Sequence, residues 1–134
     1  MTAVVDASVI LAAILGEPGG EVLDTPGELF HLSMVNLAEV HTKVIETGGT
    51  VEDVNLFLRP LPLRIRAFRE AHAEQVGRLR TSTKHRGLSL GDRACLSLAL
   101  MTDLPVYTAD TKWVGLDVGV EIRLIRENHR PGDA

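Results

Sequence analysis

The sequence predicts one α/β domain, a three-layer α/β/α arrangement built on a mostly parallel sheet. Short apolar runs rich in β-branched residues alternate with segments of helical length and pattern, which is typical of strands separated by covering helices. The chain has 134 residues, 45% hydrophobic and 24% charged, the composition of a folded domain and too few residues for two independent cores. We therefore assign residues 1–134 to one domain and expect right-handed crossovers between its strands.

The first half of the chain predicts two strands and three helices. A strand over 3–5 ends at Asp6, and the apolar stretch 7–15 is a helix that Gly16 ends. A second strand over 29–32 leads into a helix that Ser33 caps and that continues to residue 45. Thr50 and Asp53 have the spacing of a capping box and begin a third helix, which the prolines at 60 and 62 close.

The second half continues the alternation. Residues 63–68 alternate apolar side chains with arginines and predict a strand, and residues 70–80 predict a helix. Residues 84–88 predict a loop, after which Ser89 begins another helix that carries an apolar face as far as residue 101. Residues 105–108 and 121–125 predict the last two strands.

Four carboxylates occupy positions where a parallel sheet would gather them. Asp6 and Asp110 directly follow strands, at the edge where ligands bind in such sheets. Asp92 lies in the first turn of the helix that Ser89 begins, and Glu39 lies one turn beyond Asn36. Each has a structural explanation: Asp6 and Asp110 as helix caps, Asp92 as half of a capping box, Glu39 as an exposed helix residue.

If the four acids converge, their mutual repulsion requires protonation, solvation or a cation. A divalent metal is the simplest solution, and an all-oxygen set without thiolate suits Mg²⁺, with Mn²⁺ as the alternative. The five histidines show no paired ligand spacing on a helix face, so a zinc hydrolase has little support.

Charge is distributed unevenly along the chain, although the total is only −4. Residues 1–58 carry nine acids and one base, net −8, whereas residues 59–93 carry three acids and nine bases, net +6. Eight of those nine bases are arginines, which suit bidentate contacts with phosphate. The alternative is a solvated helix face whose arginines pair with Glu70 and Glu74. The single cysteine, Cys95, excludes an intrachain disulfide, and no apolar leader precedes Asp6, so we expect a cytoplasmic protein.

Four motifs in order give the chain a resemblance to a known family. They are Val4-Val5-Asp6-Ala7-Ser8, Asn36-Leu37-Ala38-Glu39-Val40, Leu88-Ser89-Leu90-Gly91-Asp92-Arg93-Ala94-Cys95-Leu96 and Thr108-Ala109-Asp110-Thr111-Lys112-Trp113. With them the chain resembles PIN-domain ribonucleases, specifically VapC-type toxins of bacterial toxin–antitoxin pairs. A departure is Arg93, which stands where many relatives have alanine.

The resemblance implies a PIN-like fold and a Mg²⁺-dependent endoribonuclease that leaves 5′-phosphate and 3′-hydroxyl ends. It implies that Asp6, Glu39, Asp92 and Asp110 are the catalytic metal ligands, with Ser8, Asn36 and Thr108 in support. We assign Arg86 and Arg93 to substrate binding and expect a structured RNA, such as a tRNA, because only five aromatic residues are available to stack on bases. A VapB-type antitoxin and a homodimer are also implied. Leu56, Phe57 and Leu58 are candidates for the antitoxin groove or for the core, and Asp117 is interpreted as an exposed loop residue.

Other acidic α/β domains fit less well. A receiver domain needs paired acids near the first strand and a lysine after a late strand, but Asp6 stands alone and Lys112 lies beyond Asp110. An aspartate-nucleophile phosphatase needs a second aspartate where Ser8 stands. The remaining alternative is a non-catalytic RNA- or protein-binding module that retains a PIN scaffold.

Overall fold

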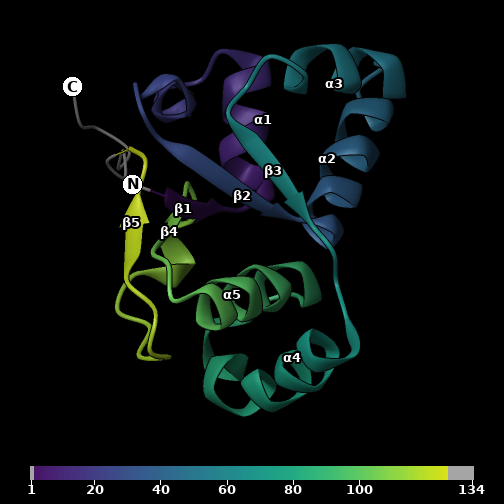
Figure 1. Cartoon of the computed structure of the whole chain (residues 1–134). Helices are drawn as coiled ribbons and strands as arrows, with labels where there is room; N and C mark the ends of the chain where they lie inside the picture. The colour runs from purple at the N-terminus through teal and green to yellow at the C-terminus, as the bar shows by residue number, and fades with distance from the viewer. Residues whose placement is uncertain (1, 127–134) are drawn as a thin grey trace, which may run out of the picture.

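The computed structural model describes residues 2–126 and shows a five-stranded parallel sheet between two layers of helices (Figure 1). The strands are β1 (Thr2–Val5), β2 (Leu29–Ser33), β3 (Leu63–Arg66), β4 (Val106–Thr108) and β5 (Ile122–Leu124). The helices are α1 (Ala7–Leu15), α2 (Met34–Glu46), α3 (Val51–Leu58), α4 (Glu70–Thr83) and α5 (Leu90–Thr102). Three short 3₁₀ turns, η1 (Gly20–Asp24), η2 (Lys84–Arg86) and η3 (Thr111–Trp113), complete the described chain. The predicted α/β class is confirmed.

The sheet order is β3-β2-β1-β4-β5, and every neighbouring pair is parallel. The first strand is therefore central, and its carboxyl end lies beside those of β2 and β4. Helices α1, α2 and α3 cover one face of the sheet and α4 and α5 the other (Figure 1). This topology brings the residues that follow β1 and β4 to one edge.

Two apolar clusters, one on each face, hold the layers together. Val5, Phe30 and Leu32 pack with α1, α2 and α3 on one face. Val4 and Val106 pack with α4, α5 and the buried Trp113 on the other. Because successive strand residues point to opposite faces, adjacent Val4 and Val5 contribute to different clusters.

Most predicted boundaries agree with the structure. Ser33 caps α2 and Gly16 ends α1 in the left-handed conformation, as predicted. Both capping boxes, Thr50–Asp53 and Ser89–Asp92, are present. Helix α4 extends three residues beyond the predicted end, and the predicted 84–88 loop contains η2. Among residues 2–126, no helix is long and apolar enough to span a membrane.

Candidate metal centre and active site

The most buried carboxylate of the site is Asp6, at the carboxyl end of the central strand. Its side chain is 5% exposed and caps α1 by accepting a hydrogen bond from the Val9 amide at 3.3 Å. Ser8 Oγ donates to Asp6 Oδ1 at 2.5 Å, and Thr108 Oγ1 donates to Oδ2 at 2.7 Å. Burial nevertheless raises the Asp6 pKa to about 6 because it outweighs these three hydrogen bonds. The fold therefore favours the neutral form of the Asp6 carboxyl group more than water does.

Two hydroxyl groups connect Asp6 to the segment that follows β4. Thr108 is fully buried, and its Oγ1 also accepts a hydrogen bond from the Asp110 amide at 3.0 Å. Ser8 Oγ accepts from the Ala109 amide at 2.9 Å. Two of the three residues predicted to support the site, Ser8 and Thr108, thus fix both the Asp6 carboxylate and the backbone that carries Asp110.

Glu39 reaches the site from α2, where Asn36 holds its carboxylate and Gly91 leaves room for it. Asn36 Nδ2 donates to Glu39 Oε1 at 2.7 Å and to the Gly91 carbonyl at 3.0 Å, which joins α2 to the start of α5. A Cβ built on Gly91 would overlap both carboxylate oxygens of Glu39. Gly91 is therefore a site residue that the sequence interpretation missed; the available signal was a glycine inside a helical pattern, directly before Asp92.

Asp92 lies in the first turn of α5 beside the same cluster. Its carboxylate accepts a hydrogen bond from the Ser89 amide at 2.9 Å, and it contributes to raising the pKa of Asp6. Burial raises the pKa of the Cys95 thiol well above its usual value, and Asp6, Asp92 and Glu39 raise it further. The Glu39 carboxylate lies against Gly91, the residue before Asp92, so these two acids occupy neighbouring positions.

Asp110 follows β4 as predicted, but its carboxylate has other partners. It accepts a hydrogen bond from the Lys112 amide at 2.9 Å, capping η3, and lies 3.5 Å from Lys112 Nζ. Within residues 2–126, no three carboxylate, histidine or cysteine side chains lie close enough together to hold a metal ion. The described arrangement brings the acids to one edge without closing them into a coordination shell.

The two arginines assigned to substrate binding make contacts within the fold. Arg86 Nη1 donates to the carbonyls of Val114 at 2.6 Å and Lys112 at 3.3 Å, connecting η2 to η3. Arg93 Nη1 donates to the Val76 carbonyl at 2.9 Å, joining α5 to α4. Their substrate-binding role stays a prediction. Asp117 lies exposed in a loop, as interpreted.

The chemistry of these residues fits a hard divalent cation. The candidate ligands are carboxylate oxygens, supported by hydroxyl and amide groups and without an available thiolate, because Cys95 is buried with a raised pKa. Burial, with a smaller contribution from the charge of Asp92, raises the pKa of Asp6, so a nearby cation would favour its ionised form. Asn36 Oδ1 is buried without a hydrogen-bond partner among residues 2–126, so it is available to a polar ligand of the site.

The fold and this acidic edge define a class, and comparison with known proteins agrees with it. The PIN domain family model matches residues 3–118, so the chain belongs to the PIN domain family. No curated protein sequence matches the chain significantly.

Solved structures share the fold at low sequence identity. VapBC2 from Rickettsia felis, bound to a DNA fragment from its promoter, superposes with a TM-score of 0.69 at 20% identity, covering 92% of this chain and 98% of that one. A toxin–antitoxin complex from Klebsiella pneumoniae superposes with a TM-score of 0.72 at 18% identity, covering 94% of this chain and 99% of that one. VapC20 from Mycobacterium tuberculosis, a sarcin-ricin loop cleaving toxin, gives 0.67 at 17% identity, covering 90% and 99%.

Proposed function

We propose that this PIN domain is a Mg²⁺- or Mn²⁺-dependent endoribonuclease and the toxin of a toxin–antitoxin pair. The observation that carries the proposal is the buried Asp6 carboxylate at the carboxyl end of the central strand, which Ser8, Thr108 and the Val9 amide hold in place. Asp92 acts on the charge of Asp6, Glu39 lies against Gly91, the residue before Asp92, and Asp110 follows the neighbouring strand β4. Further support comes from membership of the PIN family and from the fold shared with VapC20, a sarcin-ricin loop cleaving toxin.

In this proposal Asp6, Asp92, Glu39 and Asp110 hold the metal, and their neighbours fix their positions. A bound divalent ion supplies positive charge to the phosphate and lowers the pKa of a coordinated water. The Ser8 and Thr108 hydroxyls set the orientation of Asp6. Attack by water rather than by the RNA 2′-hydroxyl leaves 5′-phosphate and 3′-hydroxyl ends.

A second element of the proposal is an antitoxin of the VapB type. The fold neighbours from Rickettsia felis and Klebsiella pneumoniae are toxin–antitoxin complexes. A groove of about 490 Å³ between α1 and α2, lined by Leu11, Val35 and Ala38, opens beside Glu39. An apolar antitoxin segment in this groove would come next to the acidic site. The other candidate for antitoxin binding is the segment of residues 56–58, in which Leu56 is 62% exposed and Phe57 is 36% exposed. The homodimer and the cytoplasmic location stay predictions.

The alternative function is a non-catalytic binding module on the PIN scaffold. One observation favours it: the carboxylate of Asp110 is engaged by Lys112, and no three ligands are preassembled among residues 2–126. Failure of the purified protein to cleave any RNA in the presence of Mg²⁺ or Mn²⁺ would favour this alternative.

Two aspartates in equivalent capping boxes provide the decisive test. Asp92 and Asp53 are each the third residue of a helix and each accept a hydrogen bond from the capping residue's amide, at 2.9 Å in both cases. We expect the wild-type protein to cleave RNA in the presence of Mg²⁺, and we expect cleavage to stop when EDTA removes the metal. Asp92→Asn should lose at least about 100-fold in rate, while Asp53→Asn cleaves normally. Equal activity of the two variants, or products lacking 5′-phosphates, would contradict the proposal.

A further inference from the structure

The edge strand β3 presents arginines on the face of the sheet that α5 leaves open. Leu63 and Ile65 pack into the core on the α1–α3 side, so the alternate residues Arg64 and Arg66 point to the opposite face. In register, Arg64 lies beside His31 and Arg66 beside Ser33. Arg66 Nη1 lies 3.1 Å from His31 Nδ1.

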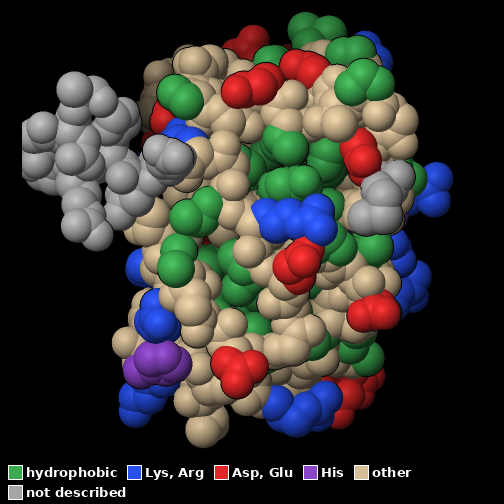
Figure 2. Space-filling view, turned by 90° about the vertical axis from the view of Figure 1, so that its left-hand side faces the viewer, with side chains coloured by type: hydrophobic (Ala, Val, Ile, Leu, Met, Phe, Trp, Pro, Cys, Tyr) green, Lys and Arg blue, Asp and Glu red, His purple; other side chains and the backbone are tan. Residues whose placement is uncertain are grey.

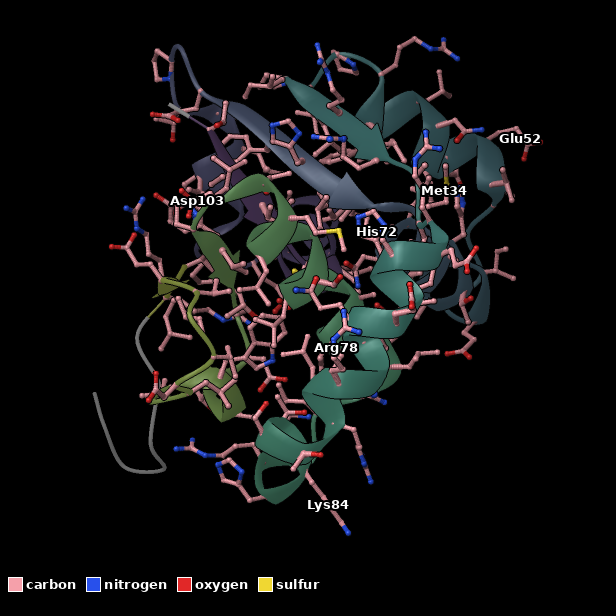
Figure 3. The ribbon with its side chains drawn as sticks, turned by 60° about the horizontal axis from the view of Figure 1, so that its bottom comes forward. Met34, Glu52, His72, Arg78, Lys84 and Asp103 are labelled. Carbon is pink, nitrogen blue, oxygen red and sulfur yellow. The ribbon has the colours of Figure 1, made fainter. Side chains whose placement is uncertain are left out.

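The first turn of α4 adds to this group of positive charges. The Arg69 amide donates a hydrogen bond to His72 Nδ1 at 3.0 Å, and the ring of Phe68 stacks on His72 with centroids 5.8 Å apart. Figure 3 shows His72 at the end of α4 nearest the strands, whereas Lys84 extends from the far end of the helix. We call Arg64, Arg66 and Arg69 the β3 arginine cluster.

None of these three arginines forms an ion pair with a carboxylate among residues 2–126. The ion pairs within this described part of the chain are Lys112–Asp110, Arg123–Glu121 and Arg126–Glu17. Ion pairs of the arginines with Glu70 and Glu74, the alternative interpretation of this segment, are not among them. On the β5 side of the molecule, by contrast, acidic and basic side chains are interspersed around apolar ones (Figure 2).

The two histidines report the same excess of positive charge. Burial lowers the pKa of His31, and Arg66 and Arg64 lower it further. Burial also lowers the pKa of His72, and Arg66 and Arg69 add to the effect. Because the charge is not neutralised internally, an anion from outside the chain would be bound favourably here.

The cluster also lies at the same edge as the acidic site. Arg66 ends β3 and pairs with Ser33, the residue that caps α2, the helix of Asn36 and Glu39. Strand β3 is two strands from β1, about 10 Å at the usual strand spacing. An RNA strand whose scissile phosphate sits at Asp6 can therefore place a neighbouring phosphate on β3. The planar guanidinium groups suit the two oxygens of such a phosphate.

We propose that the β3 arginine cluster is a phosphate-binding subsite that holds the RNA backbone beside the cleaved bond. It rests on the proposed ribonuclease function for its substrate. It assigns substrate binding to arginines without carboxylate partners, whereas Arg86 and Arg93 are held by carbonyl groups.

The test compares two double substitutions that remove the same charge. Arg64→Gln/Arg69→Gln changes the cluster at two exposed positions, and Arg78→Gln/Arg80→Gln changes two exposed positions further along α4. Binding of a fluorescein-labelled RNA hairpin is measured by anisotropy in EDTA, between about 50 and 200 mM KCl. We expect the cluster variant to bind at least about tenfold more weakly and its log–log salt slope to fall by about 1.4, as for two lost phosphate contacts.

The control should bind within about twofold of wild type, since no phosphate contact is removed. Equal affinities of the two variants, or no measurable RNA binding by the wild type, would overturn the subsite. Loss of affinity for an acidic peptide or antitoxin with RNA binding unchanged would also overturn it, and would identify a protein-docking surface. If RNA binding falls as expected but wild-type protein cleaves no RNA with metal, the subsite stands and the ribonuclease proposal fails.

Discussion

Replacing Asp6 with asparagine should stabilise the metal-free protein at neutral pH. Asp6 is almost completely buried, and burial is the main cause that raises its pKa from 3.8 to about 6. Asparagine has nearly the same shape, is a good helix cap, and its carbonyl oxygen can still accept hydrogen bonds. The substitution therefore removes the buried charge while keeping most of the local structure.

The size and sign of the effect follow from linkage between proton binding and folding. A rise of about 2 pKa units corresponds to about 3 kcal/mol. As pH rises from about 4 to 6, the unfolded chain releases this proton before the folded protein does, so wild-type stability falls. Well above pH 6, the full free-energy cost of burying the ionised Asp6 carboxylate is present. The stability advantage of Asp6→Asn should thus grow by about 2–3 kcal/mol between pH 4 and pH 7.5.

Urea denaturation in EDTA at the two pH values measures this difference. Asp53→Asn is the matched control, because Asp53 is an exposed helix-capping carboxylate and its replacement removes no buried charge. Added Mg²⁺ at about 100 times its Kd should restore about 2.7 kcal/mol to wild type and much less to Asp6→Asn. An Asp6→Asn advantage that is independent of pH, or largest at pH 4, would refute the reasoning.

Two further substitutions separate positioning from stability. Gly91→Ala should gain about 1 kcal/mol in helix propensity, but its Cβ would displace the Glu39 carboxylate. We therefore expect ribonuclease activity to fall about 10- to 100-fold without a lower urea midpoint. The control is Gly77→Ala, where an added Cβ meets nothing, and it should gain stability and keep full activity. Thr108→Val removes the hydroxyl that donates to Asp6 and should cost about 1–3 kcal/mol in urea unfolding; an unchanged midpoint would show that this bond contributes nothing.

The alternation of apolar strands and helices was sufficient to predict the α/β architecture. It also placed Asp6 and Asp110 correctly, because the carboxyl ends of parallel strands always meet at one edge. The capping boxes were readable because they are local, three residues apart. Features that depend only on neighbours along the chain, or on a general rule of parallel sheets, could therefore be predicted from the sequence.

Contacts between residues distant in sequence could not be predicted from the sequence. Arg93 donates to a carbonyl 17 residues away and Arg86 to one 28 residues away, and nothing in their local sequence indicates those contacts. The 63–68 segment was predicted to be a strand, but its edge position follows from the strand order. That position leaves Arg64 outside the core and gives the arginine-rich segment its exposed face.

Helix capping and metal binding are compatible roles for the same carboxylates. Asp6 caps α1, Asp92 completes the capping box of α5 and Asp110 caps η3. In a parallel sheet the helices that follow strands begin at the ligand-binding edge, so acids that cap them are already gathered there, and helix N-termini favour their charge. Asp6 shows the limit of this arrangement, since its pKa remains raised despite the cap. Aspartate-to-asparagine substitutions therefore isolate the charge that a metal requires from the hydrogen bond that a helix requires.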